Sequence, residues 1–199
     1  MEGDKMRVNE KGRICVHDLS KSYNGIAVLK NYNLELEPGS RTIIMAPSGY
    51  GKTTLLRLMM GLEQADSGEI IGVPEKKSAV FQENRLCEGF SAIKNVEMID
   101  RYPGCPDVRT LLTEIGLGSS LDKSVRTLSG GMQRRCAIVR AMAADSDIVF
   151  LDEPFQGLDK ENYHLTAAFI KKYLNGRMLV VVSHNEEDAE LLGADICRM

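Results

Sequence analysis

The chain has 199 residues, which is enough for one domain or for one domain with a small subdomain. Its 25 basic and 28 acidic residues give a formal net charge of −3, which argues against a nucleic-acid partner, since such binding needs a basic surface. No apolar run approaches the roughly 20 residues that cross a bilayer, and the polar N-terminus lacks the apolar core of a signal peptide. The five cysteines are never in C-x-x-C spacing, so we expect free thiols in a cytoplasmic protein.

The first part of the chain predicts mainly β-strands. Residues 13–19 and 32–40 alternate apolar and polar side chains, as half-buried antiparallel strands do. Residues 41–46, RTIIMA, form a continuous apolar run, which is typical of a strand buried on both faces. The other elements expected here are a helix over residues 52–62, ended by Gly61, and strands over residues 67–71 and 77–82.

Strand patterns are absent from residues 83–127, where helical periodicity takes over. Residues 91–99 and 107–117 have apolar side chains at helical spacing, with a break containing prolines and a glycine between them. We expect this segment to be a helical subdomain inserted into an α/β body. The body then consists of residues 13–82 and 128–199, within a single domain spanning residues 1–199.

Helix and strand patterns alternate over the rest of the chain. Helices are expected over residues 130–145, 161–176 (ended by Gly176) and 186–194, and buried strands over residues 147–154 and 177–185. Alternation of this kind implies right-handed crossovers and a mostly parallel sheet, so the expected fold class is α/β.

The stretch APSGYGKTTLL, residues 46–56, fits the phosphate-binding pattern G-x-x-x-x-G-K-[ST], with Ala46 at its first position. Backbone N–H groups in a glycine-rich loop at a helix N-terminus form an anion cradle. Lys52 would reach the β- and γ-phosphates, and the Thr53 hydroxyl would bind Mg²⁺. Tyr50 occupies a slot that usually holds a small residue, and it either touches the nucleotide or faces solvent. The candidate nucleotide-binding residues in this loop are Ser48, Gly49, Gly51, Lys52, Thr53 and Thr54.

Two carboxylates follow one another at the end of the apolar strand IVFLD. Asp152 is suited to hold Mg²⁺ through water. Because side chains alternate on a strand, Glu153 is expected to point elsewhere and to polarise an attacking water. The plainer alternative is an acidic strand end that caps the next loop.

At LSGGMQRR, residues 128–135, the chain resembles the signature motif of ABC-type ATPases, the nucleotide-binding subunits of ABC transporters. Other motifs of that family occur in order around it. VFQE resembles the Q-loop, with Gln82; GLD the D-loop, with Asp159; and VVVSHN the switch-histidine motif, with His184. Tyr23 matches the aromatic residue that stacks on adenine, although an ordinary loop tyrosine is the alternative. The resemblance spans roughly residues 13–198.

The resemblance implies a P-loop NTPase fold with a mostly parallel core sheet, an N-terminal antiparallel β subdomain and an inserted α-helical subdomain. It implies ATP and Mg²⁺ as ligands, with Glu153, His184 and Gln82 in catalysis. Gln82 would sense Mg²⁺ or the attacking water, as a possible third metal-site residue beside Thr53 and Asp152. Ser129, Gly130 and Gly131 precede a helix and form a second anion site, although a serine N-cap alone would give the same pattern. The resemblance also implies a head-to-tail, ATP-dependent homodimer. In it, the nucleotide of one chain would be bound by four residues of the other, Ser129, Gly130, Gly131 and Asp159.

The fragment FQENRLCEGFSAIKNV resembles the importer subfamily for nitrate, sulfonates, taurine and related solutes. This implies ATP-driven solute import through separate permease subunits, with a solute-binding protein, at the inner face of the membrane. Two alternatives are an ABC ATPase of a non-transport membrane complex, in cell division or lipoprotein release, and a soluble ABC ATPase acting on nucleic acid or ribosomes. Leu86, Phe90 and Ile93 are candidates for a groove that receives a permease helix, with Phe90 favoured and Ile93 expected in the core.

Overall fold

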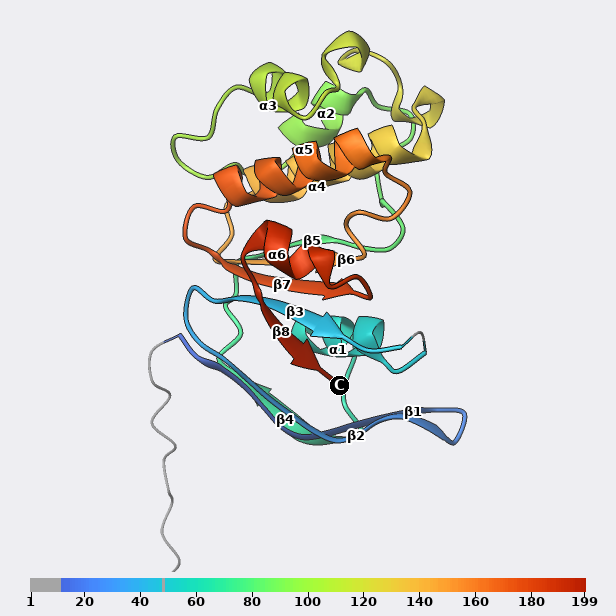
Figure 1. The fold of residues 1–199 in the computed structure, drawn as a ribbon, viewed down its shortest axis with the longest axis vertical. Helices are drawn as coiled ribbons and strands as arrows, with labels where there is room; N and C mark the ends of the chain where they lie inside the picture. Colours follow the sequence, from blue (N-terminus) through green and yellow to red (C-terminus); the bar gives the residue numbers. More distant parts are fainter. Residues whose placement is uncertain (1–11, 48) are drawn as a thin grey trace, which may run out of the picture.

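The computed structural model describes residues 12–47 and 49–199, and their elements stack in layers (Figure 1). Helices α2 to α5 lie on one side of a parallel sheet. Helix α1 lies on the other side, between this sheet and a smaller antiparallel sheet. The helices are α1 Lys52–Met59, α2 Ala92–Glu97, α3 Val108–Glu114, α4 Gly130–Ala143, α5 Lys160–Tyr173 and α6 Glu187–Leu192, with 3-10 turns at Gly118–Ser120 and Val125–Thr127.

The central sheet has the strand order β5-β6-β7-β3-β8, and every neighbouring pair is parallel. The expected mostly parallel sheet is therefore confirmed. Its strands are β3 Arg41–Met45, β5 Lys77–Val80, β6 Ile148–Asp152, β7 Met178–Ser183 and β8 Asp195–Arg198.

The antiparallel sheet has the order β2-β1-β4. Its strands are β1 Ile14–Tyr23, β2 Ile26–Leu36 and β4 Ser67–Ile71. The first two are longer than expected, because β1 and β2 form a hairpin whose pairing continues to Tyr23 and Ile26, although their outer ends are exposed. Hydrophobic alternation could reveal only the half-buried portion of this hairpin.

Two hydrophobic cores lie on the two faces of the central sheet. Within β6, Val149 and Leu151 pack into the core shared with helices α2 to α6, while Phe150 packs into the core around α1. Alternate residues of a strand point to opposite faces, and both faces are covered, so the strand reads as a continuous apolar run. The burial of all five β6 residues confirms the buried strand expected within residues 147–154.

Two smaller expectations differ from the structure, and two others agree with it. Strand β8 was not expected, because its sequence DICR is short and half polar. The left-handed turn after α5 begins at Asn175, with φ 52°, one residue before Gly176. Gly61, with φ 73°, follows the end of α1 as expected. The five cysteines are free thiols, also as expected.

Arg177 anchors the far end of helix α4. Its guanidinium donates five hydrogen bonds, to the carbonyl oxygens of the last turns of α4 and α5 and to the Ser146 hydroxyl. Carbonyl groups at helix C-termini lack intrahelical donors, so one arginine satisfies two helix ends at once. The bonds run to Met142, Ala144, Ser146, Tyr173 and Leu174, at 2.5 to 3.1 Å.

Helices α2 and α3 and both 3-10 turns fall within residues 83–127, and we propose that this segment acts as one helical subdomain within the single domain. Ile93 is 6% exposed and belongs to the core, as expected, and Leu86 packs partly against that core. Phe90 is 48% exposed. None of the helices in the described ranges is long and apolar enough to cross a membrane.

Candidate nucleotide-binding site

The phosphate loop joins the buried strand β3 to helix α1, which is the strand–loop–helix context that the motif requires. Lys52 is 9% exposed, and its Nζ donates hydrogen bonds to the carbonyl oxygens of Ala46, at 2.6 Å, and Pro47, at 3.1 Å. The ammonium group therefore lies across the mouth of the loop. Ser48 lies outside the described residues.

Glycine is needed in this loop for conformation and for space. Gly49 and Gly51 have φ values of 86° and 85°, which L side chains rarely adopt. At Gly51 a Cβ atom would also lie 2.7 Å from Cγ1 of Val28, on strand β2 of the other sheet. The loop thus packs directly against β2. Around it, a cavity of about 250 Å³ is lined by Lys52, Thr53, Thr54, Gln82, Asp152 and Glu153, among others.

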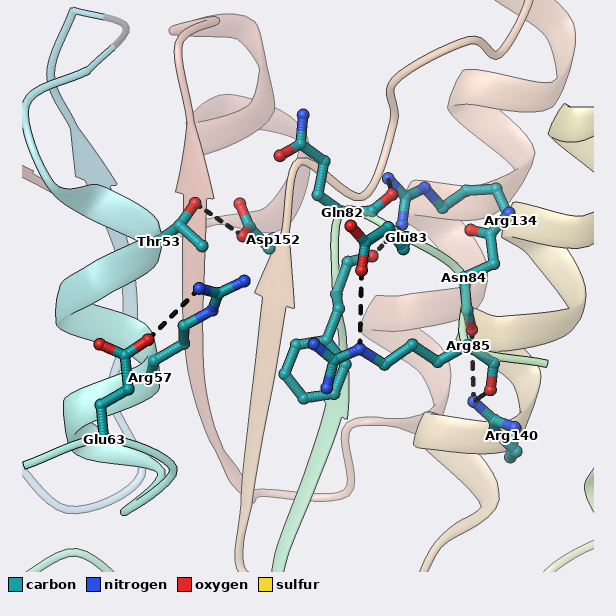
Figure 2. A network of polar contacts seen from close by, with 11 residues as sticks. Thr53, Arg57, Glu63, Gln82, Glu83, Asn84, Arg85, Arg134, Arg140 and Asp152 are labelled. Atoms are coloured by element: carbon teal, nitrogen blue, oxygen red, sulfur yellow. Dashed lines mark hydrogen bonds and ion pairs between the residues drawn. The ribbon is translucent and has the colours of Figure 1, made fainter.

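Thr53 and Asp152 form the candidate metal site. The Thr53 hydroxyl donates a hydrogen bond to Oδ2 of Asp152, at 2.9 Å (Figure 2). Asp152 is 3% exposed, and burial raises the pKa of its carboxyl, which a bound cation would counteract. Mg²⁺ is usually bound by one or two carboxylates together with phosphate oxygens and water. A hydroxyl and a carboxylate at the foot of a phosphate loop fit that requirement.

Glu153 and His184 meet beside this pair. Nδ1 of His184 lies 3.0 Å from both carboxylate oxygens of Glu153. The expected reason for the direction of Glu153 was wrong, however. Strand β6 ends at Asp152, and Glu153 has φ 48°, so a left-handed turn, not strand alternation, sets the direction of its side chain. This backbone conformation is uncommon outside glycine, and such strain is often found at functional sites.

A second cavity, of about 480 Å³, lies at the N-terminus of α4, where Ser129, Gly130, Gly131 and Asp159 are among its lining residues. Ser129 is the N-cap of α4, and its hydroxyl accepts a hydrogen bond from the Met132 N–H group at 3.3 Å. Asp159 is the N-cap of α5, and its hydrogen bonds from Asn162 lower its pKa. The cavity therefore lies beside two helix N-termini, which favour an anion.

Gln82 lines both cavities. It follows strand β5, in a segment without helix or strand, and Figure 2 shows its side chain between the Thr53–Asp152 pair and helix α4. The structure thus brings Gln82 together with the residues that the sequence assigned to the metal and to the attacking water.

Tyr23 is not among the residues that line these two cavities. Tyr23 is 40% exposed, and its hydroxyl donates a hydrogen bond to the Glu63 carboxylate. The pKa of Tyr23 is raised, mainly by partial burial and secondly by the contact with Glu63. Tyr50 is 59% exposed and lines a further cavity of about 430 Å³, beside Val28, Tyr32 and Met199. The exposure agrees with a Tyr50 side chain that faces solvent, and contact with the nucleotide stays a prediction.

Sequence reasoning missed Arg134 in helix α4. It is 3% exposed, and it donates hydrogen bonds to the carbonyl oxygens of Phe81, at 2.5 Å, and Gln82, at 3.0 Å. In the sequence, Arg134 is one of two adjacent arginines in an amphipathic helix, and nothing there shows which carbonyl groups it would meet.

A phosphate loop, a hydroxyl–carboxylate pair and a strained glutamate at the edge of a parallel sheet define a P-loop nucleotide-binding protein. A family model described as ABC transporter matches residues 29–156. The chain belongs to the ABC transporter family.

Named relatives and a solved structure agree with this assignment. The chain is 34% identical to "Nod factor export ATP-binding protein I" of Cupriavidus metallidurans, over 92% of this chain and 66% of that protein. It is 33% identical to "Taurine import ATP-binding protein TauB" of Roseobacter denitrificans, over 90% of this chain and 75% of that protein. Further relatives are named as import proteins for aliphatic sulfonates or for sulfate and thiosulfate. The chain spans only 66% and 55% of the lengths of the Nod factor and sulfate/thiosulfate proteins.

The structure is similar to the dimeric ATP-binding cassette MJ0796, solved in a post-hydrolysis state with ADP and Pi. The TM-score is 0.77 at 28% identity, and the match covers 89% of this chain and 90% of that one. The expected P-loop fold of the ABC ATPase type is thereby confirmed.

Proposed function

We propose that this chain binds ATP with Mg²⁺ and hydrolyses it. The observation that carries the proposal is the single cavity in which the phosphate loop, the Thr53–Asp152 pair and Glu153 meet. Bound Mg²⁺ supplies charge neutralisation on the phosphate oxygens. Lys52 adds a fixed positive charge at the same end of the nucleotide, and Thr54 contributes a hydroxyl from the first turn of α1.

Glu153 is the proposed general base for the attacking water. A base must lie within hydrogen-bond reach of the water and be held in a defined direction. The left-handed turn fixes the backbone of Glu153, and His184 fixes its carboxylate through contacts of 3.0 Å. Gln82 lines the same cavity and is the candidate for orienting the water. Tyr23 is the candidate for stacking on adenine.

The cavity at Ser129, Gly130, Gly131 and Asp159 is proposed to bind the γ-phosphate of a second copy of the chain. It is separate from the cavity at the phosphate loop, so one nucleotide in one chain does not need both. A head-to-tail homodimer pairs the two kinds of cavity, and the similarity to a dimeric ATP-binding cassette supports it.

We further propose that hydrolysis powers solute import through separate permease subunits at the inner face of the membrane, with a solute-binding protein. Relatives named for taurine, sulfonate and sulfate import support small anionic or organic solutes as the cargo. Another relative is named for export, so the direction of transport needs its own test, with the permease subunits isolated.

The test is the variant Glu153→Gln, which keeps the shape of the side chain and removes its charge. We expect it to bind Mg-ATP, to lose ATP turnover and to accumulate an ATP-bound dimer in light scattering. Glu190→Gln, on the exposed face of α6, is the matched control and should behave as the wild type. Adding Ser129→Arg to Glu153→Gln should prevent the dimer. Wild-type turnover by Glu153→Gln, or normal dimerisation of the double variant, would contradict the proposal.

A further inference from the structure

Resting on the proposed ATPase function, we propose that Arg134 is a positioning residue that holds Gln82 at the boundary between the two cavities. Arg134 lies in the second turn of α4 and reaches across to the segment that follows β5 (Figure 2). Its two terminal nitrogens donate separately, Nη1 to the Phe81 carbonyl and Nη2 to the Gln82 carbonyl.

These carbonyl groups receive their hydrogen bonds from Arg134, outside their own segment. Strand β5 ends at Val80, so Phe81 and Gln82 have left the sheet and belong to no helix. Neither residue is part of a regular hydrogen-bonded ladder, and hydrogen bonds from a charged donor are stronger than those from a neutral one. Arg134 thus holds the backbone of Gln82 in place, and with it the direction in which the Gln82 side chain points.

The positive charge of Arg134 also lies near the negative charges of Asp152 and Glu153. Its guanidinium is buried, and burial lowers its pKa, while the negative charges of Asp152 and Glu153 raise it. Arg134 in turn lowers the pKa of Asp152. The negative charges of these two carboxylates therefore offset part of the cost of burying the guanidinium next to the Phe81 and Gln82 carbonyl groups.

Arg140 provides a matched comparison in the same helix. Its Nη2 donates to the carbonyl oxygens of Asn84, at 3.3 Å, and Arg85, at 2.9 Å. The two arginines therefore both donate hydrogen bonds to the backbone of residues 81–85, but only Arg134 binds the carbonyl group of Gln82. Loss of Arg140 loosens the segment two residues further on and leaves the Gln82 contact in place.

The experiment compares the steady-state ATPase kinetics of Arg134→Met, Arg134→Lys and Arg140→Met. We expect Arg134→Met to lower kcat by about tenfold, equivalent to about 1.4 kcal/mol, with the KM for ATP little changed. A lysine can supply only a single point charge, so Arg134→Lys should restore kcat in part. Arg140→Met should change kcat by about twofold or less, because Arg140 contacts Asn84 and Arg85 and the Gln82 contact of Arg134 is kept.

A double-mutant cycle with Gln82→Ala separates positioning from general destabilisation. If Arg134 acts through Gln82, adding Arg134→Met to Gln82→Ala should lower kcat little further. Additive losses, or equal losses of kcat in Arg134→Met and Arg140→Met, would overturn the proposal.

Hydrogen–deuterium exchange of the ligand-free protein gives a readout that does not depend on turnover. Exchange in a peptide covering residues 81–84 should rise in Arg134→Met and less in Arg140→Met, since fewer contacts then hold the segment. Unchanged exchange in Arg134→Met would refute the inference. A wild-type chain without ATPase activity would refute the proposed function instead, and the exchange would still decide whether Arg134 holds this segment.

Discussion

Replacing Gly51 by alanine tests the packing of the phosphate loop against strand β2. The substitution adds one methyl group at a residue with φ 85°. That methyl carbon would lie 2.7 Å from Cγ1 of Val28, 3.0 Å from the Val28 carbonyl oxygen and 3.1 Å from Cδ2 of Leu29. Two of these atoms belong to side chains, but the third is backbone in a paired strand and cannot move freely.

The cost has two parts. A left-handed backbone costs an alanine about 1–2 kcal/mol relative to glycine. Forcing an extra carbon into a packed contact costs about 1–3 kcal/mol more. The free energy of unfolding should therefore fall by roughly 2–5 kcal/mol, and a chain of this size loses about 2–4 °C in Tm for each kcal/mol. We expect the Tm of Gly51→Ala to fall by roughly 4–20 °C on those scales.

Gly49→Ala is the matched control for this prediction. Gly49 has nearly the same φ, 86°, but among the described residues other than its chain neighbours no atom lies within 4 Å of the position its Cβ would take. It should show only the backbone part, about 1–2 kcal/mol. Thermal unfolding without nucleotide measures both variants. Equal losses of Tm in the two variants would refute the contact between the loop and β2, because the steric part would then be absent.

Two further predictions concern Asp188 in helix α6 and the exposed Phe90 in the helical subdomain. Burial raises the pKa of Asp188, which accepts hydrogen bonds from Ser183 and Tyr163, so its stabilising contribution is full below the ordinary value of 3.8 and is lost as pH rises through the higher folded-state pKa. In urea unfolding, Asp188→Asn should therefore gain stability relative to the wild type as the pH rises above the ordinary value of 3.8, and a difference that does not change with pH would contradict this. Phe90→Ala removes an exposed ring and should leave the ATPase rate near that of the wild type while weakening capture of the permease in detergent. Undiminished capture would assign the contact to another surface.

The sequence predicted the parts of the fold in which local pattern and tertiary packing agree. The first four residues of strand β6 are apolar because both faces of the sheet are covered. The phosphate loop after β3 could be predicted because its spacing of glycines, lysine and threonine is specific to phosphate binding. The buried Ile93 and the exposed Phe90 could also be predicted, since one follows helical periodicity and the other follows a glycine in a loop.

The features that could not be predicted depend on partners distant in the chain. Strand β8 is too short and polar to be recognised, and it is a strand because β3 offers it a free edge. The left-handed turn at Glu153 is set by its N–H group, which donates to the carbonyl oxygen of Val182 in the neighbouring strand. Arg134 reaches a segment about 50 residues away, so no local pattern reveals its role.

Helix α4 has the mechanical layout of a lever with its pivot at one end. At the C-terminal end, Arg177 donates five hydrogen bonds, one of them to the carbonyl oxygen of Met142. At the N-terminal end, Ser129 and Gly130 are exposed. At 1.5 Å per residue, Ser129 lies roughly 20 Å from this pivot and Arg134 roughly 12 Å. A small sideways displacement imposed at Ser129 by a partner's nucleotide would therefore move Arg134 about three fifths as far. It would carry the backbone of Gln82 in the same direction.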